Sequence, residues 1–206
     1  MTLESLSDEI VQCRKCPRLV TWREDVAVKK RRAYQDWEYW GKPVPGFGDP
    51  CAKVLVVGLA PGAHGSNRTG RMFTGDASGE FLFAALHRAG FANQPTSTFR
   101  GDGLLLTDIF ITAVCRCAPP DNKPSPEEIR LCLPYLHTEI KLLNGIKGIV
   151  ALGRIAFDQV IKYYNSERRS LPGLYFQHGV RYETGDGLPW LIASYHPSRQ
   201  NTQTGR

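Results

Sequence analysis

The sequence predicts an α/β fold in which helices cover both faces of a parallel sheet. Four short apolar runs, at residues 53–58, 104–114, 148–152 and 191–194, are separated by helical patterns. Continuous apolar runs are typical of strands buried on both faces, and alternation of strands with helices is typical of parallel sheets. The 206 residues, 42% of them hydrophobic, suit one domain with a sizeable core, so we expect a single domain over residues 1–206.

The first fifty residues are expected to form a short helix and then an irregular segment. Leu3, Leu6 and Ile10 have helical spacing, and residues 33–52 are rich in Gly, Pro and aromatic side chains. Between them lie eight basic residues: Arg14, Lys15, Arg18, Arg23, Lys29, Lys30, Arg31 and Arg32. A basic run beside aromatic residues can follow a phosphate backbone. We favour the simpler interpretation of a solvated helix face followed by a loop over the core.

Two further helices have recognisable starts. Ser78 is the expected N-cap of a helix that ends at Gly90. Its expected inner face consists of Phe81, Leu82, Ala85, Leu86 and Ala89. The run Ser125-Pro126-Glu127-Glu128 starts a second helix, because a capping Ser is followed by Pro in the first turn and by Glu three residues later. We expect this helix to reach about residue 143.

The end of the chain completes the alternation. We expect a helix at 154–164 and a hairpin at 174–184 before the last strand. Ligands bind beyond the carboxyl ends of the strands in such sheets. Three segments fall there: residues 58–79, 117–123 and 196–199. Segments that are distant in the sequence are therefore expected to meet at one cleft.

Residues 58–79, which read GLAPGAHGSNRTGRMFTGDASG, form the most informative segment. The loop is rich in glycine and contains one carboxylate, Asp76. Glycine lets backbone N–H groups approach a ligand closely. The segment contains neither G-x-x-x-x-G-K-[ST] nor G-x-G-x-x-G, which argues against a nucleotide-binding enzyme.

Charge and hydropathy limit the class of protein. The net charge of +6 favours an anionic partner, with nucleic acid as the leading candidate. No apolar run reaches the roughly 18 residues of a membrane span. The acidic, amphipathic start MTLESLSDEI differs from a signal peptide. We therefore expect a soluble cytoplasmic protein, in which disulfides are disfavoured.

The cysteine spacing indicates a metal site. Cys13 and Cys16 form a C-x-x-C pair, and Cys117 and Cys132 are separated by fourteen intervening residues. Four thiolates from two segments can hold Zn²⁺ or an iron–sulfur cluster, and spacing does not separate the two. Cys115, two residues before Cys117, is an equally placed ligand on sequence grounds. Free structural cysteines with a chance C-x-x-C are the alternative.

Three motifs together resemble the uracil-DNA glycosylase superfamily: GLAPGAHGSNRTGRMFTGDASG, RCAPPDNKPSPEE and SYHPSRQNTQTGR. The resemblance spans residues 13–206 and is greatest to family 5, the thermophilic B-type enzymes related to the iron–sulfur family 4. It implies a three-layer α/β/α fold around a four-stranded parallel sheet. It also implies a structural 4Fe–4S cluster, with zinc as the runner-up, on Cys13, Cys16, Cys117 and Cys132. The family has a ligand cysteine directly before Ala-Pro-Pro, and Cys117 holds that position here, so the resemblance favours Cys117 over Cys115.

The resemblance further implies a monofunctional DNA glycosylase of prokaryotic base excision repair. Such an enzyme flips uracil out of the DNA stack and hydrolyses its N-glycosidic bond. Asp76 would serve the attacking water, His196 would stabilise the departing base, Asn122 would read its polar edge and Phe73 would stack on it. The implied base pocket also includes Ala60, Gly62, Ala63 and Gly65. The implied DNA contacts are Arg68, Ser198, Arg199 and Gln200. We expect a monomer.

The chain departs from the wider superfamily in its base pocket. Residues 58–63 carry no polar side chain where many relatives have a carboxylate or amide, and Ala113 stands where relatives place an Asn. These departures indicate a broader pocket, with hypoxanthine and xanthine as further candidate substrates. Relatives also continue into another helix after Arg206. The alternative function is a non-catalytic, metal-stabilised nucleic-acid-binding module.

Each expected site residue also has a structural interpretation. Asp76 can favour a helix N-terminus, His196 can be a satisfied core histidine, and Phe73 can belong to the core. Asn122 is a typical turn residue.

Overall fold

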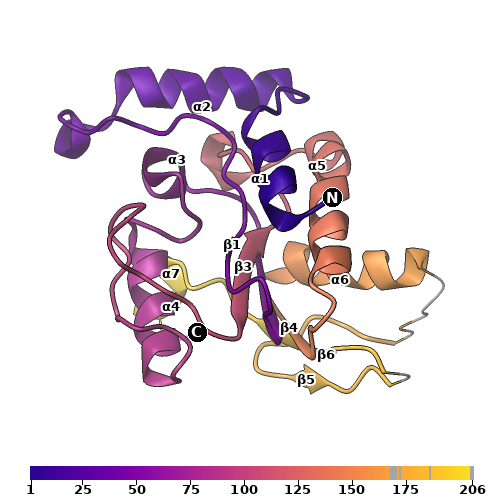
Figure 1. Ribbon diagram of the computed structural model, residues 1–206. Coiled ribbons are helices and arrows are strands. Elements are labelled where there is room, and N and C mark those ends of the chain that lie inside the picture. Colours follow the sequence, from indigo (N-terminus) through magenta and orange to yellow (C-terminus); the bar gives the residue numbers. More distant parts are fainter. Residues whose placement is uncertain (168–170, 172, 186, 205–206) are drawn as a thin grey trace.

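The computed structural model contains one six-stranded sheet between two groups of helices (Figure 1). The structure describes residues 1–167, 171, 173–185 and 187–204. The strands are β1 (Phe47–Gly48), β2 (Val54–Gly58), β3 (Ile109–Ala113), β4 (Gly148–Leu152), β5 (Arg181–Tyr182) and β6 (Trp190–Ser194), in the spatial order β1-β3-β2-β4-β6-β5. The helices are α1 (Leu3–Val11), α2 (Pro17–Lys29), α3 (Ser66–Thr69), α4 (Ala77–Arg88), α5 (Pro126–Leu142), α6 (Arg154–Ser166) and α7 (Arg199–Gln203). Short 3-10 turns lie at Arg32–Tyr34 and Pro120–Asn122.

The four central strands are parallel, but the expected four-stranded sheet is wrong. Two antiparallel strands, β1 beside β3 and β5 beside β6, extend the sheet at its edges. Each has two residues, too few to show the alternation that identifies a strand in a sequence. The expected hairpin at 174–184 is also wrong, because the partner of β5 is β6. The strand expected over 104–114 is confined to β3, and Asp108, just before it, has a left-handed backbone with φ of 61°.

Two cores lie on opposite faces of the sheet. Leu55 and Val57 of β2 pack in the larger core with residues of α5 and α6, whereas Val56 packs in the other core with Phe83 of α4. Successive side chains of a strand point to opposite faces, so a continuous apolar run supplies both cores. This burial on both faces explains why the central strands could be recognised as parallel.

The helix starts show which local predictions were right. Ser125 caps α5 as expected: its hydroxyl oxygen accepts from the Glu128 backbone N–H at 3.2 Å, and the Glu128 carboxylate accepts from the Ser125 N–H at 2.7 Å. The predicted cap of α4 is wrong, since Asp76 rather than Ser78 caps it.

The predicted inner face of α4 is right at Leu82 and Leu86, which pack against or in the core that contains Phe83, and wrong at Phe81 and Ala89, which are exposed. Phe83 and Leu86 are buried, whereas Phe81 is 52% exposed. A Cβ on Gly79 would lie 1.8 Å from the Phe73 carbonyl oxygen, so this glycine lets the helix approach the preceding loop. Residues 79, 83 and 86 are spaced on one helical face, and this close approach turns that face inward.

Helix α2 lies across the end of the molecule and continues into a segment that folds toward α3 (Figure 1). It carries three of the eight basic residues, Arg18, Arg23 and Lys29, and the exposed Arg18 and Lys29 agree with the expected solvated helix face. Arg23 is an exception to the solvated face, because it is 2% exposed and donates to the Cys117 sulfur at 2.8 Å. In the described part of the chain, no helix has the length and apolar content needed to cross a membrane.

Candidate active site

A cavity of about 700 Å³ lies where the glycine-rich loop leaves β2 and enters α4. The three segments expected at the carboxyl ends of the strands all contribute to its wall. The predicted residues that line it are Ala60, Gly62, Ala63, Gly65, Phe73, Asp76, Asn122, His196 and Ser198. The topology therefore gathers residues that are up to 138 positions apart, from Ala60 to Ser198, as the order of the parallel strands predicts.

Asp76 serves as a helix cap and also lines the cavity. One carboxylate oxygen, Oδ1, accepts from the Gly79 backbone N–H at 3.0 Å. The other, Oδ2, lies over two glycines, since a Cβ would be 3.1 Å from it on Gly62 and 2.0 Å from it on Gly65. Burial raises the pKa of Asp76, while hydrogen bonds from the backbone of Gly79 and Ser78 oppose the rise. The carboxylate therefore holds a proton more readily than an exposed aspartate does.

The Phe73 ring is held rigidly at the cavity wall. Its backbone is left-handed with φ of 52°, a conformation that is rare for a bulky side chain and is found mostly at functional sites. A Cβ on Gly58 would lie 2.8 Å from the Phe73 ring. The ring stacks on the His196 imidazole with a centroid distance of 5.7 Å and an interplanar angle of 27°. The two rings together form a flat aromatic wall.

Two hydrogen bonds to its carbonyl oxygen hold His196 in place, and its imidazole is uncharged near neutral pH. Its carbonyl oxygen accepts from the Asn201 side-chain amide at 2.8 Å and from the Ser198 N–H at 2.7 Å. Burial lowers the pKa of the imidazole below its ordinary value of 6.5. A neutral imidazole has one N–H donor and one acceptor nitrogen, so His196 can donate a hydrogen bond without adding charge.

Asn122 reaches the cavity from the 3-10 turn at Pro120–Asn122. It is exposed and left-handed with φ of 56°, which Asn tolerates better than most residues. Its amide supplies both a donor and an acceptor at the mouth of the cavity.

Several residues outside the predicted site also line the cavity, and three of them carry large polar side chains on or beside the basic run and the glycine-rich loop: Arg31, Tyr34 and His64. The Tyr39 hydroxyl oxygen lies 3.0 Å from His64 Nδ1. Burial, with help from Arg31 and Arg68, lowers the pKa of His64. His64 carried a usable signal, because it is the only histidine in the glycine-rich loop. Arg31 and Tyr34 belong to the basic and aromatic run, so a simple solvated face followed by a core-covering loop does not describe this end of it.

The residues expected to contact DNA occupy different environments. Arg68 is 3% exposed, and its guanidinium donates to the carbonyl oxygens of His64 and Gly75, so the expected direct contact with DNA is wrong. Ser198 lines the cavity and caps α7, accepting from the Asn201 N–H at 3.3 Å. Gln200 is exposed on α7. The side chain of Arg199 lies outside the described part of the structure.

The cysteines gather at a second, small pocket between the N-terminal segment and α5. Those that line it are Cys13, Cys16, Cys117 and Cys132, whereas Cys115 packs in the larger core. The Cys132 sulfur accepts from the Arg116 backbone N–H at 3.2 Å, and a hydrogen bond with Cys115 lowers the pKa of Cys132 to about 7. Among the described residues, no group of three or more His, Cys, Asp or Glu side chains is arranged to hold a single metal ion.

Comparison with known proteins identifies one family. A family model described as the uracil DNA glycosylase superfamily matches residues 45–206. A "Type-5 uracil-DNA glycosylase" of Thermus thermophilus is 52% identical over 206 residues, 100% of this chain and 91% of the relative. One of Mycobacterium bovis is 53% identical over 195 residues, 94% of this chain and 72% of the relative. A "Type-4 uracil-DNA glycosylase" of Pyrobaculum aerophilum is 33% identical over 205 residues, covering 96% of this chain and 84% of the relative.

Proposed function

The chain belongs to the uracil-DNA glycosylase superfamily, and we propose that it is a monofunctional glycosylase that removes uracil from DNA. The observation that carries this proposal is the single cavity that joins Asp76 to the aromatic wall of Phe73 and His196. A base must leave the stack before its glycosidic bond can be reached, and a cavity of this size admits one. The reaction adds a water hydroxyl to the sugar C1′, and the base leaves with the electrons of the broken bond and gains a proton.

Asp76 is the group in the glycine-rich loop that can act on the sugar and the water. As an anion it stabilises the positive charge that develops on the sugar, and it orients the attacking water or accepts its proton. Its cap on α4 fixes one carboxylate oxygen through Gly79 and leaves the other toward Gly62 and Gly65. The ionised form is the active one, so activity should fall as acid protonates it.

The aromatic wall and Asn122 act on the base. Phe73 offers a ring face for stacking, and neutral His196 donates an N–H to the negative charge that develops on the departing base. Asn122 matches its amide donor and acceptor to the polar edge of the base. Ala60, Gly62, Ala63 and Gly65 leave backbone groups accessible to the base at the cavity wall.

The range of bases is proposed to extend to hypoxanthine and xanthine. The side chains that follow β2, from Leu59 to Ala63, are apolar or absent, so they impose no hydrogen-bond requirement specific to uracil. The cavity of about 700 Å³ also leaves room for the larger purine ring. Ser198, Arg199 and Gln200, at the start of α7 beside the cavity, are proposed to contact the duplex next to the flipped nucleotide.

We further propose a 4Fe–4S cluster on Cys13, Cys16, Cys117 and Cys132. These four thiols fit a shared site because they line one pocket and two of the sulfur atoms accept hydrogen bonds from protein N–H groups. Cluster atoms lie between the ligands, so a cluster tolerates more widely spaced sulfur atoms than zinc, which binds each at about 2.3 Å. The cluster would supply a cross-link between the segment before α2 and the segment leading into α5. Iron, sulfide and zinc analysis of freshly purified protein distinguishes the two metals.

A panel of duplex oligonucleotides, each carrying one deaminated base, tests the function. We expect alkali-labile abasic product from uracil, without strand cleavage before alkali treatment. Asp76→Asn should lower the excision rate by roughly 10²-fold or more, because the anion is lost while the shape is kept. Salt-sensitive DNA binding without base release from any member of the panel would instead indicate a non-catalytic binding module.

A further inference from the structure

Arg68 is a buried arginine that joins two separate parts of the glycine-rich loop. Its Nε donates to the His64 carbonyl oxygen at 2.8 Å, and its Nη2 donates to the Gly75 carbonyl oxygen at 2.7 Å. Gly75 immediately precedes Asp76, and His64 immediately precedes Gly65, over which the Asp76 carboxylate lies. One guanidinium therefore fixes the backbone on both sides of the carboxylate.

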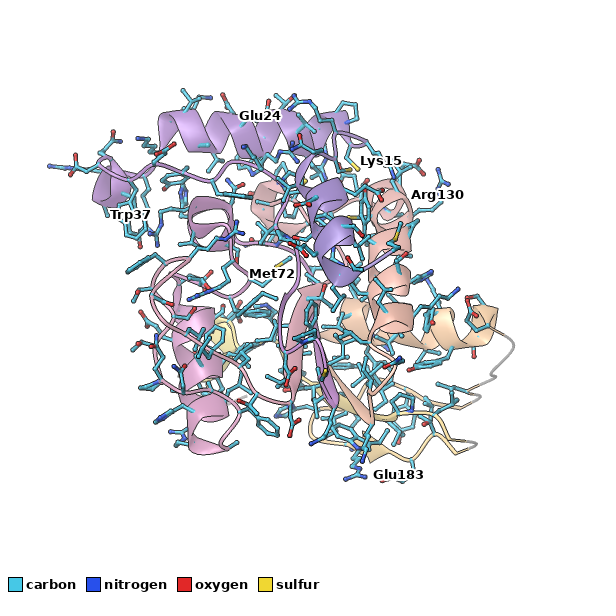
Figure 2. All side chains as sticks on the ribbon, viewed as in Figure 1. Lys15, Glu24, Trp37, Met72, Arg130 and Glu183 are labelled. Atoms are coloured by element: carbon cyan, nitrogen blue, oxygen red, sulfur yellow. The ribbon has the colours of Figure 1, made fainter. Side chains whose placement is uncertain are left out.

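The guanidinium is itself held by two aromatic rings. Its central carbon lies 3.9 Å from the centroid of the Tyr34 ring and 4.0 Å from that of the Trp37 ring. The two rings are nearly perpendicular, at 80°. Cation–π contacts of this kind stabilise a buried guanidinium whose third nitrogen, Nη1, has no hydrogen-bond partner among the described residues. Figure 2 shows Trp37 in the segment beyond α2, which folds toward α3, the helix that carries Arg68.

The positive charge of Arg68 also acts on Asp76. Burial has the largest effect on the carboxyl group and raises its pKa, and the backbone N–H groups of Gly79 and Ser78 lower it. The Arg68 charge lowers this pKa further, whereas the neighbouring Glu80 of α4 raises it. The other titratable groups that line the cavity are Arg31, Tyr34, His64 and His196. Burial lowers the pKa of both histidines, so they are neutral near pH 7. Arg68 is therefore the buried cation that favours the ionised form of Asp76.

We propose that Arg68 is a positioning residue for Asp76: from the interior, Arg68 holds the loop at His64 and Gly75, and it does not touch DNA. This inference rests on the proposed function, since it assigns Asp76 the active carboxylate. It has two separable parts. The two hydrogen bonds set where the carboxylate lies, and the charge sets the pH range over which it is ionised.

Two variants separate these parts. Arg68→Lys keeps the charge but cannot span both carbonyl oxygens, so we expect the acid limb of the kcat/KM profile to stay in place while kcat falls by roughly 10²-fold, the usual loss for a misplaced catalytic group. Arg68→Gln removes the charge as well, so the acid limb should also move to higher pH. The measurement is single-uracil excision by the purified protein over a pH series, with thermal unfolding recorded for each variant.

Arg71 supplies the matched control. It is a second buried arginine in the same loop, but it pairs with Asp102 at 2.8 Å. Arg71→Gln removes a buried positive charge from the same loop, so it should lower the melting temperature and leave the acid limb in place. If Arg68→Gln does not fold, Trp37→Leu tests the positioning part of the proposal, because it removes one of the two rings that hold the guanidinium. We expect a lower kcat with KM little changed. An unmoved acid limb in Arg68→Gln, or an equal shift in Arg71→Gln, would overturn the role of Arg68 while wild-type excision of uracil kept the proposed function intact.

Discussion

At the scale of single residues, Asp76 keeps its position because two neighbouring residues have no side chain. The Asp76 Oδ2 atom occupies the space in which a Cβ of Gly65 would stand, and it lies 3.1 Å from where a Cβ of Gly62 would be. The glycines that suggested a phosphate cradle in the sequence thus make room for a carboxylate. This arrangement makes the site sensitive to the smallest possible substitution.

Gly65→Ala should abolish most of the activity with a smaller effect on folding. The new Cβ would lie 2.0 Å from Oδ2 and would have to displace the carboxylate, so we expect a loss of kcat/KM of roughly 10²-fold or more. Gly145→Ala is the matched control, because its Cβ would meet only ordinary contacts, the nearest at 3.6 Å from the Ala52 carbonyl oxygen. Similar excision rates for the two variants would show that the Asp76 carboxylate tolerates displacement.

His196 should make stability depend on pH in a defined direction. Burial lowers its pKa in the folded protein, so between that value and about 6.5 the unfolded chain binds more protons than the folded one. Its contribution to stability is therefore fully present above about pH 6.5 and is lost as the pH falls through that range. Urea unfolding at pH 7.5 and 5.5 should show a smaller loss of stability in His196→Gln than in the wild type. An equal loss would mean that the pKa of His196 is the same in the folded and unfolded chain.

Motifs predicted which residues line the cavity better than they predicted which residues are buried beside it. Phe73, Asp76 and His196 follow or precede elements of the parallel sheet, whose topology places them together. Nothing local distinguishes Arg68 from a surface cation, because its burial depends on rings at positions 34 and 37. Arg71 is similar, since its partner Asp102 lies 31 positions away. Burial of a long charged side chain depends on such distant partners, so a local pattern does not reveal it.

At the scale of elements, local hydrogen-bond patterns were reliable where the sequence contained the whole pattern. The capping box of α5 is complete within four residues, and the helix begins where it predicts. For α4 the local pattern predicted the wrong N-cap, because both Asp76 and Ser78 are good caps. The contact of Gly79 with the Phe73 backbone selects Asp76. A cap choice that depends on tertiary packing lies beyond sequence patterns.

The two serines give a direct comparison of these helix starts. Ser125→Ala removes the acceptor for the Glu128 N–H and should destabilise the protein by about 1 kcal/mol. Ser78→Ala leaves the Asp76 cap in place and should change stability by less than about 0.5 kcal/mol. Chemical denaturation of both variants is the measurement. Equal losses would indicate that Ser78 also stabilises the start of α4.

The capping box also belongs to the contact between α2 and α5. The Glu128 carboxylate accepts from Arg18 Nε at 2.7 Å and from Arg18 Nη2 at 2.6 Å. Cys16 immediately precedes α2, and Cys132 lies on α5. This ion pair therefore joins the two helices next to the proposed cluster, and with a cluster bound the N-terminal segment would have two attachments near the second pocket.

At the scale of the whole molecule, the excess positive charge is placed where the proposed substrate would bind. The net charge is +6, and the last residues of α2 and those after it read Lys29-Lys30-Arg31-Arg32. Arg31 is exposed and lines the cavity, so this cationic segment reaches the site from an element outside the sheet. The duplex flanking a flipped nucleotide presents phosphates on both sides, and cations there would release bound counterions.

Arg31→Gln should weaken binding of a duplex containing uracil and make that binding less sensitive to salt. If Arg31 neutralises one phosphate, the slope of log K against log salt concentration should fall by about 1, whichever base is in the cavity. Arg130→Gln is the matched control, because Arg130 lies on the exposed side of α5, paired with Glu127, and does not line the cavity. Its slope should equal that of the wild type within error. Equal changes in both variants would show that only the net charge matters, and no change in Arg31→Gln would place the DNA backbone away from the end of α2.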